Sequence, residues 1–136
     1  MYAPTTELKL RGNDPTGHGY YGAKRGTRKH KGLDVVTTPG EDILSPITGY
    51  FKRIGRVYSS TKKFKLIELV NDTYRVKLMY VEPLSFSTNV FIQEGQKIGV
   101  AQDISSYWGG GMTNHLHVEV YKNGLLTDPE PLFDLD

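Results

Sequence analysis

The sequence predicts an all-β protein with an antiparallel sheet or sandwich, and three observations support this fold class. First, 15 glycines and 7 prolines punctuate short runs of β-favouring residues along the 136-residue chain. Second, the apolar residues form no amphipathic helical pattern of typical length. Third, the turn signals Asn71-Asp72 and Asn123-Gly124 each stand beside such runs. A chain of this length is expected to form one domain, residues 1–136, with its own core.

Five runs rich in Val, Ile, Phe, Tyr and Thr are expected to form the strands, because these residues favour extended structure. They are 33–37, 49–59, 64–70, 74–82 and 115–122. Asn71-Asp72 predicts a hairpin between the third and fourth runs, and Asn123-Gly124 predicts one after the fifth. The polar segments 11–32 and 103–114 are expected to be surface loops. Each ends at a motif with metal-binding side chains, so we expect the two loops to form the walls of a functional site.

The composition excludes several classes of protein. The chain has no cysteine, which rules out a cysteine zinc site and a disulfide framework. The net charge of +2 is mild, and the basic run 24–31 indicates a solvated loop rather than a nucleic-acid contact. No apolar run approaches the roughly 20 residues that a membrane helix needs, so no membrane insertion is expected. The first ten residues lack the apolar core of a signal peptide.

Two short motifs hold three of the four histidines: His30-x-x-x-Asp34 and His115-x-His117. In a strand, residues two apart share a face, so His115, His117 and Glu119 would lie opposite an apolar face. Gly32 is expected to let the backbone turn so that His30 and Asp34 face one point. Two imidazoles and one carboxylate, with one histidine to spare, fit a catalytic zinc with an open position. Taken singly, each motif is also explained by polar residues on a surface strand or loop.

The two motifs together, with the segments around them, resemble the lysostaphin-type zinc endopeptidases, which cleave peptide bonds in bacterial peptidoglycan. The similar segments follow the order of the family and are 20–35, 42–55, 74–85, 94–102 and 115–124. The resemblance implies an antiparallel β fold, the duplicated hybrid motif, with a groove over the sheet. It also implies that His30, Asp34 and His117 bind zinc and that His115 is a catalytic histidine.

The sequence departs from this family in the central strand. Active members carry a second catalytic histidine there, in a Tyr-x-His-Leu context. Here residues 80–84 read Tyr-Val-Glu-Pro-Leu, and no histidine stands between His30 and His115. We expect Glu82 to occupy the place of that histidine and, in an active enzyme, to serve near the metal. The other interpretation of Glu82 is an exposed carboxylate at a strand end before Pro83.

The same departure resembles the leukocyte-cell-derived chemotaxin branch, which keeps the zinc site, lacks that histidine and is viewed as a signalling protein. The local similarity lies in Tyr80 and Pro83 and in residues 28–35. It supports the alternative to an enzyme, namely a zinc-bearing binding or structural component.

The leading hypothesis is a zinc-dependent endopeptidase of peptidoglycan that works outside the cell or in the cell envelope. No cell-wall-binding module is visible, and attachment to a larger assembly such as a phage tail would explain this and the missing signal peptide. Among the other candidates, His18 is expected at the surface. Tyr107 and Trp108 either stack on substrate or pack their loop, and Arg25 and Arg28 are expected to be solvated rather than to bind stem-peptide carboxylates.

Overall fold

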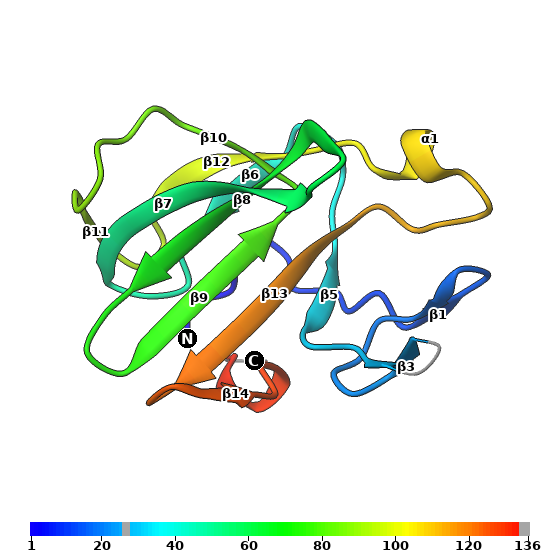
Figure 1. The fold of residues 1–136 in the computed structure, drawn as a ribbon, viewed down its shortest axis with the longest axis horizontal. Helices are drawn as coiled ribbons and strands as arrows, with labels where there is room; N and C mark the ends of the chain where they lie inside the picture. Colours follow the sequence, from blue (N-terminus) through cyan, green and yellow to red (C-terminus); the bar gives the residue numbers. More distant parts are fainter. Residues whose placement is uncertain (26–27, 134–136) are drawn as a thin grey trace.

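The computed structural model describes residues 1–25 and 28–133, and its strands pair antiparallel throughout. A seven-stranded central sheet has the order β11-β7-β8-β9-β13-β14, with β5 also paired to β13 (Figure 1). Its strands are β5 (Leu33–Val36), β7 (Gly49–Tyr58), β8 (Thr61–Val70), β9 (Tyr74–Met79), β11 (Phe91–Ile92), β13 (His115–Lys122) and β14 (Leu125–Thr127). The predicted all-β antiparallel fold class is confirmed, and all five predicted strand regions contain strands.

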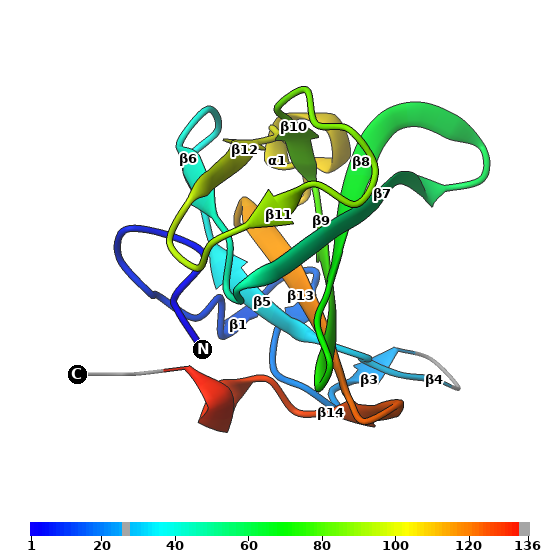
Figure 2. The ribbon, with the colours of Figure 1, turned by 90° about the vertical axis from the view of Figure 1, so that its left-hand side faces the viewer.

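A second, three-stranded sheet has the order β10-β12-β6. Its strands are β6 (Asp42–Leu44), β10 (Val81–Pro83) and β12 (Lys97–Ala101). Figure 2 shows these strands together in the upper part of the view. The core joins the two sheets, because Ile43, Val81 and Ile98 of the smaller sheet belong to one buried apolar cluster with Ile67 and Val118 of the central sheet. None of these five side chains exposes any surface to solvent.

Both predicted hairpin turns are present. The Asn71 side-chain carbonyl accepts hydrogen bonds from the backbone N–H groups of Thr73 and Tyr74, which closes the turn between β8 and β9. Asn123 and Gly124 both have positive φ angles, 50° and 82°, at the turn between β13 and β14. Two consecutive positive φ angles match the twist of the flanking strands, so this dipeptide forms a tight hairpin.

The predicted strand 74–82 is wrong in one respect, because the structure divides it at Tyr80. Tyr80 has φ 75°, which turns the chain out of the central sheet. The three residues that follow form β10 and pair with β12 in the smaller sheet. Alternation of residue types cannot reveal such a break, because the residues on both sides of Tyr80 are equally suited to strands.

The two predicted loops lead into the first residues of β5 and β13, and they contain short elements of their own. Segment 11–32 holds the two-residue strands β1 (Asn13–Asp14), β2 (Gly17–His18), β3 (Lys24–Arg25) and β4 (Arg28–Lys29), and residues 26–27 of the basic run lie outside the described residues. Segment 103–114 holds a single helical turn, α1 (Ser105–Trp108). Near the C-terminus a 3-10 turn, η1 (Glu130–Leu132), precedes the buried Phe133. No helix in the described part of the chain is long and apolar enough to cross a membrane.

Asn114 fastens the second loop to the sheet. Its buried amide oxygen accepts hydrogen bonds from the backbone N–H groups of Ile104 and Ser105, at 2.8 and 3.1 Å. Its amide nitrogen donates to the Thr37 hydroxyl at 2.9 Å and to the Gln102 carbonyl at 3.0 Å. The side chain of Asn114, the residue just before His115, therefore makes four hydrogen bonds that hold the loop in place.

We predict that Asn114→Ala lowers the free energy of unfolding by about 1–3 kcal/mol, because it leaves the buried Ile104 N–H without its acceptor. Urea unfolding measures the change. The control is Asn13→Ala, which removes an exposed amide and should stay within about 0.5 kcal/mol of the wild type. Equal unfolding midpoints for the two variants would contradict this account of the loop.

Candidate metal centre

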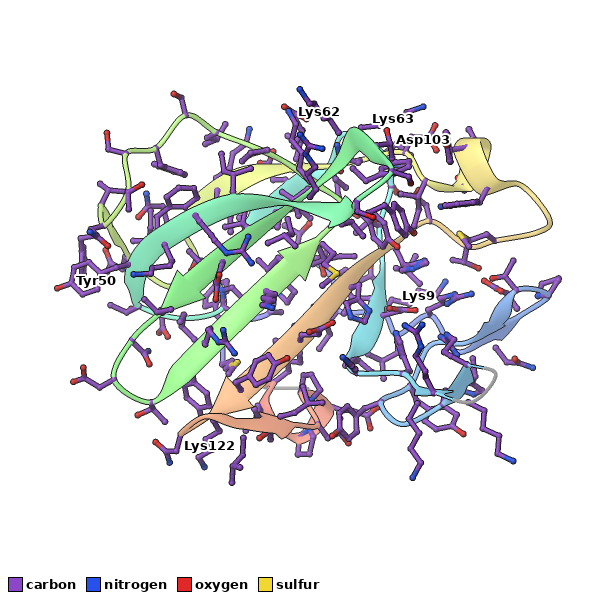
Figure 3. All side chains as sticks on the ribbon, viewed as in Figure 1. Lys9, Tyr50, Lys62, Lys63, Asp103 and Lys122 are labelled. Atoms are coloured by element: carbon purple, nitrogen blue, oxygen red, sulfur yellow. The ribbon has the colours of Figure 1, made fainter. Side chains whose placement is uncertain are left out.

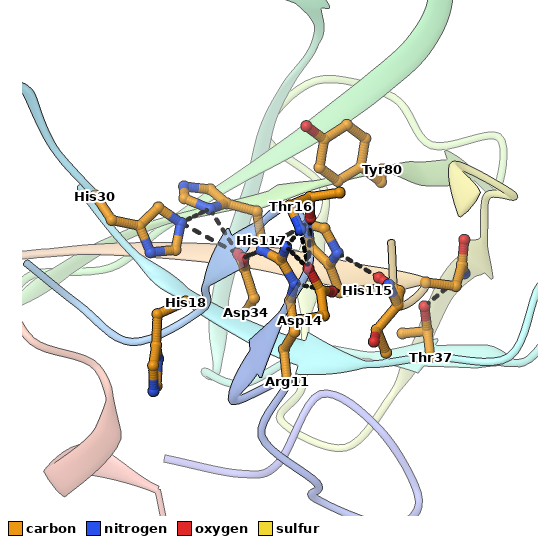
Figure 4. Close-up of polar contacts among 12 residues, drawn as sticks. Arg11, Asp14, Thr16, His18, His30, Asp34, Thr37, Tyr80, His115 and His117 are labelled. Atoms are coloured by element: carbon orange, nitrogen blue, oxygen red, sulfur yellow. Dashed lines mark hydrogen bonds and ion pairs between the residues drawn. The ribbon is translucent and has the colours of Figure 1, made fainter. Parts of the chain in front are cut away.

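The pairing of β5 with β13 builds the centre. Their antiparallel register places Asp34 directly opposite His117 and Val36 opposite His115. Directly opposite residues on a sheet project from the same face, so the Asp34 carboxylate and the His117 imidazole meet. His30 arrives from the loop before β5, where its backbone N–H donates to the Ala23 carbonyl at 2.7 Å. Figure 4 shows these side chains converging.

Three ligand-type atoms lie close together at this point. Asp34 Oδ1 lies 3.0 Å from His117 Nδ1 and 3.2 Å from His30 Nε2, and the two histidine nitrogens are 3.0 Å apart. A tetrahedral zinc with bonds of about 2.0–2.1 Å holds its ligand atoms about 3.3 Å from one another. The observed triangle is close to one face of such a tetrahedron. The donor set of two imidazoles and one carboxylate is also one that zinc accepts, so the residues present fit the ion.

The outer nitrogens of the two histidines are held by acceptors. His30 Nδ1 lies 2.9 Å from the Tyr20 carbonyl, which can only accept, so the proton sits on Nδ1 and the Nε2 lone pair faces the triangle. His117 Nε2–H donates a hydrogen bond to the carboxylate of Glu119 at 2.9 Å. Such acceptors fix the tautomer and the ring orientation of a metal-binding histidine.

The Asp34 carboxylate carries its charge in a nearly dry place. Its residue is only 1% exposed. Burial raises the pKa of Asp34, but the hydrogen bond from His117 and the nearby positive charge outweigh it and hold that pKa well below its usual range. The second carboxylate oxygen accepts a hydrogen bond from the Arg11 guanidinium at 2.8 Å, and Arg11 also pairs with Asp14 at 2.9 Å. One oxygen of Asp34 is thus held by Arg11 while the other faces the histidines.

The protonation of His117 follows from the same contacts. Burial lowers the pKa of His117, but its hydrogen bonds to Asp34 and Glu119 win and raise that pKa to about 9. In the metal-free protein a proton on Nδ1 therefore bridges His117 and Asp34 near neutral pH. A metal cation would take the place of that proton, since a ligating imidazole must be neutral.

His115 stands beside the triangle and keeps a free lone pair. Its Nδ1 lies 2.8 Å from the Thr113 carbonyl, which can only accept a hydrogen bond, so Nδ1 carries the proton. Its Nε2 lies 3.5 Å from the outer oxygen of Asp34. Burial lowers the pKa of His115, which favours the neutral imidazole. A neutral histidine with its Nε2 lone pair in the pocket can accept a proton there.

A surface pocket contains the triangle and His115. It is also lined by Arg11, Thr16, Arg25, Met79, Tyr80 and Met112. The structure therefore brings four of the five predicted site residues together, namely His30, Asp34, His117 and His115. Sequence reasoning missed Arg11, which lies 23 residues before Asp34 in a polar loop and shows no spacing signal.

Glu82 is the predicted site residue that the structure does not bring to the pocket. Its carboxylate binds the Lys65 ammonium at 2.8 Å, and the Glu82 side chain is 50% exposed. The amide nitrogen of Gln102 is its other neighbour, at 3.5 Å. The break at Tyr80 is the reason, because it sends β10 into the smaller sheet. The position of Glu82 thus matches the exposed strand-end carboxylate, and it is Met79 and Tyr80 that reach the pocket from the end of β9.

The remaining candidates lie around this pocket. His18 packs against Tyr20, with ring centroids 4.2 Å apart, and is not part of the metal-type cluster among the described residues. Arg25 lines the pocket and donates to the His18 carbonyl at 2.6 Å, whereas Arg28 is exposed. Tyr107 packs edge-on against Phe64, and Trp108 packs edge-on against Tyr58, yet each remains about half exposed, at 48% and 49%. These two residues therefore pack their loop and still present surface to solvent.

A largely buried histidine–aspartate–histidine triangle over an antiparallel sheet, with a third histidine beside it, is a centre of the kind that metallopeptidases use. The model of peptidase family M23 matches residues 28–129, and the chain belongs to this family.

Two kinds of relative show the same likeness. Leukocyte cell-derived chemotaxin-2 of Mus musculus is 28% identical over 124 residues, which are 86% of this chain and 76% of that protein. The catalytic domain of the antimicrobial peptidase lysostaphin from Staphylococcus simulans has a TM-score of 0.65 at 22% identity, over 85% of this chain and 89% of that one. Csd3 of Helicobacter pylori has a TM-score of 0.70 at 21% identity and covers 99% of this chain, which spans 34% of Csd3. The two structural likenesses show the fold alone.

We predict that Asp34→Ala abolishes binding of one zinc per chain, whereas His115→Ala largely retains it. Asp34 supplies the only carboxylate of the triangle, while the His115 lone pair lies outside the triangle. Elemental analysis of the purified, dialysed proteins measures the zinc content. Equal loss of zinc in both variants would show that the roles of the histidines are assigned wrongly.

We also predict that Glu119→Gln weakens zinc binding about 10-fold or more, because the His117 imidazole loses the charged acceptor that orients it. Competition with a chromophoric chelator measures the dissociation constant. Glu94→Gln is the matched control. Glu94 is exposed, lies in the segment after β11 and does not line the pocket. An unchanged constant in Glu119→Gln would remove Glu119 from the centre.

Proposed function

We propose that this chain is a zinc-dependent endopeptidase that hydrolyses peptide bonds of bacterial peptidoglycan. The observation that carries the proposal is the His30–Asp34–His117 triangle with His115 beside it in one pocket. Membership of a peptidase family and the fold of the lysostaphin catalytic domain support it. The substrate rests on the resemblance of the sequence motifs to the peptidases that act on this polymer.

In this proposal His30, Asp34 and His117 would hold the zinc in the pocket that His115 also lines. Zinc at such a site polarises a carbonyl group and lowers the pKa of water to about 7. Arg11 and Glu119 keep the Asp34 carboxylate and the His117 imidazole oriented, as their hydrogen bonds require.

His115 is the proton-transfer residue of the proposed reaction. As water attacks the scissile carbonyl carbon, His115 Nε2 accepts the proton that the water loses. The same nitrogen then returns the proton to the departing amine when the C–N bond breaks. The Thr113 carbonyl accepts a hydrogen bond from Nδ1–H at 2.8 Å. This bond keeps the proton on Nδ1, so Nε2 is the basic nitrogen throughout.

The alternative is a zinc-bearing binding or structural component without peptidase activity. The specific observation in its favour is that the central strand brings Tyr80, and not a histidine, to the pocket. The similarity to a chemotaxin over 86% of this chain supports the same alternative. The two hypotheses share the metal centre and differ only in turnover.

The proposed substrate places the protein outside the cell or in the cell envelope. Attachment to a phage tail or another larger assembly stays a prediction from the sequence.

We predict that the zinc-loaded protein reduces the turbidity of purified bacterial cell walls and that a chelator stops this loss. His115→Ala should retain zinc yet lose at least about 100-fold in rate, because general acid–base catalysis typically contributes that much. The chelator should also lower the melting temperature while leaving a cooperative transition, since zinc stabilises the native state by mass action. Unchanged wall turbidity with fully loaded wild-type protein would favour the binding component.

A further inference from the structure

Tyr80 is held in a backbone conformation that is unusual for its residue type. Its φ is 75°, and the other non-glycine residues with a positive φ in the described chain are both asparagines, Asn89 and Asn123. Asparagine tolerates positive φ because its side chain can hydrogen-bond locally, whereas an aromatic residue gains no such compensation. Strained residues of this kind cluster at functional sites, where the surrounding structure enforces them.

The surrounding structure does enforce the conformation of Tyr80. Its backbone N–H donates to the Lys65 carbonyl at 2.9 Å, and its carbonyl accepts from the Gln102 N–H at 3.0 Å. These two bonds tie Tyr80 to β8 and to the segment after β12. The strained conformation directs the side chain into the pocket that holds the triangle, above His115 in Figure 4.

The ring of Tyr80 contacts His115 directly. The two rings meet edge to face, with centroids 5.6 Å apart and planes at 85°. Phe64 packs on Tyr80 in the same manner at 5.8 Å. The phenol is therefore fixed beside the group that we assign to proton transfer, and not free to swing into solvent.

Within residues 1–25 and 28–133, the hydroxyl of Tyr80 has one hydrogen-bond partner, the hydroxyl of Tyr58 at 2.7 Å. Two hydroxyls that share one hydrogen bond need only one of their two protons for it. When Tyr58 donates, the proton of Tyr80 is available to the pocket, which Tyr80 lines and Tyr58 does not. Burial, followed by the bond to Tyr58, raises the pKa of Tyr80 above its ordinary value, so the phenol keeps its proton.

We propose that Tyr80 is a catalytic residue whose phenolic O–H donates a hydrogen bond to the carbonyl oxygen of the scissile peptide as that oxygen becomes negative. The proposal rests on the proposed peptidase function. As the water oxygen bonds to the carbonyl carbon, the C=O π pair moves onto the carbonyl oxygen and the water proton goes to His115. Tyr80 keeps its proton throughout and stabilises the new charge, while Tyr58 donates to Tyr80 and aligns it.

A small tetrahedral anion tests this donor independently of turnover. Dimethylphosphinate has two oxygens on a tetrahedral centre, which stand for the water oxygen and the carbonyl oxygen at the moment of attack. We expect Tyr80→Phe to bind dimethylphosphinate about 10-fold more weakly than the zinc-loaded wild type, the loss typical of one hydrogen bond to a charged acceptor. Titration calorimetry on both proteins, with zinc content verified, measures the dissociation constants.

Two further variants separate a donor from a packing role. Tyr58→Phe removes the same bond between the two hydroxyls but leaves the Tyr80 proton in place. Its loss of affinity for dimethylphosphinate should therefore be smaller than that of Tyr80→Phe. Tyr50→Phe is the matched control, because Figure 3 shows Tyr50 at the opposite end of the molecule from α1. It should bind like the wild type. If hydrolysis is present, Tyr80→Phe should lower kcat about 100-fold or more with KM and zinc content unchanged.

Equal losses in Tyr80→Phe and Tyr58→Phe, or a wild type that does not bind dimethylphosphinate, would overturn the role of Tyr80. Undiminished wall hydrolysis by Tyr80→Phe would also overturn it and would leave the peptidase function standing. Selective loss of dimethylphosphinate binding in Tyr80→Phe, with no hydrolysis by the wild type, would support the donor and contradict the peptidase function.

Discussion

The antiparallel register between β5 and β13 is the constraint on which the candidate site depends. It sets Asp34 opposite His117, and a slip of one residue would send one of these side chains to the other face of the sheet. The apolar face opposes that slip, because Val35, Leu116 and Val118 are fully buried on it. β13 also pairs with β9 along six residues, so the register is shared by three strands. The hydrophobic core thereby positions the polar site.

Charge balance explains how the fold tolerates such a site. A buried carboxylate without partners is costly, and Asp34 is almost completely buried. Arg11 satisfies one oxygen, while the protonated His117 satisfies the other. The raised pKa of His117 means that a proton completes the balance when no metal is bound. A divalent cation would replace this proton among the same atoms, so the centre is organised before it is loaded.

The break at Tyr80 connects the architecture to the functional question. The chain crosses from the central sheet to the smaller sheet at this residue, and the crossing both removes Glu82 from the pocket and directs Tyr80 into it. In our proposal, turnover in this pocket therefore depends on the phenol of Tyr80. A protonated phenol donates a hydrogen bond as a histidine can, but it does not exchange protons near neutral pH. Such a residue is suited to stabilising charge and leaves proton transfer to His115.

The sequence alone determined the features that depend on local spacing. Period-two alternation put His115 and His117 on one face, Asn123-Gly124 predicted its hairpin, and the two motifs together indicated a metal site. Only the tertiary structure decided which distant groups complete the site, because Arg11, Tyr20 and Tyr80 reach it through long-range packing. It also revised the role of Gly32, where a Cβ would lie 2.3 Å from the Val118 carbonyl, so close strand approach requires glycine there. Glu82 was misplaced for the same reason: the φ of the residue before β10 is set by contacts with β8 and the segment after β12, and no local pattern encodes those contacts.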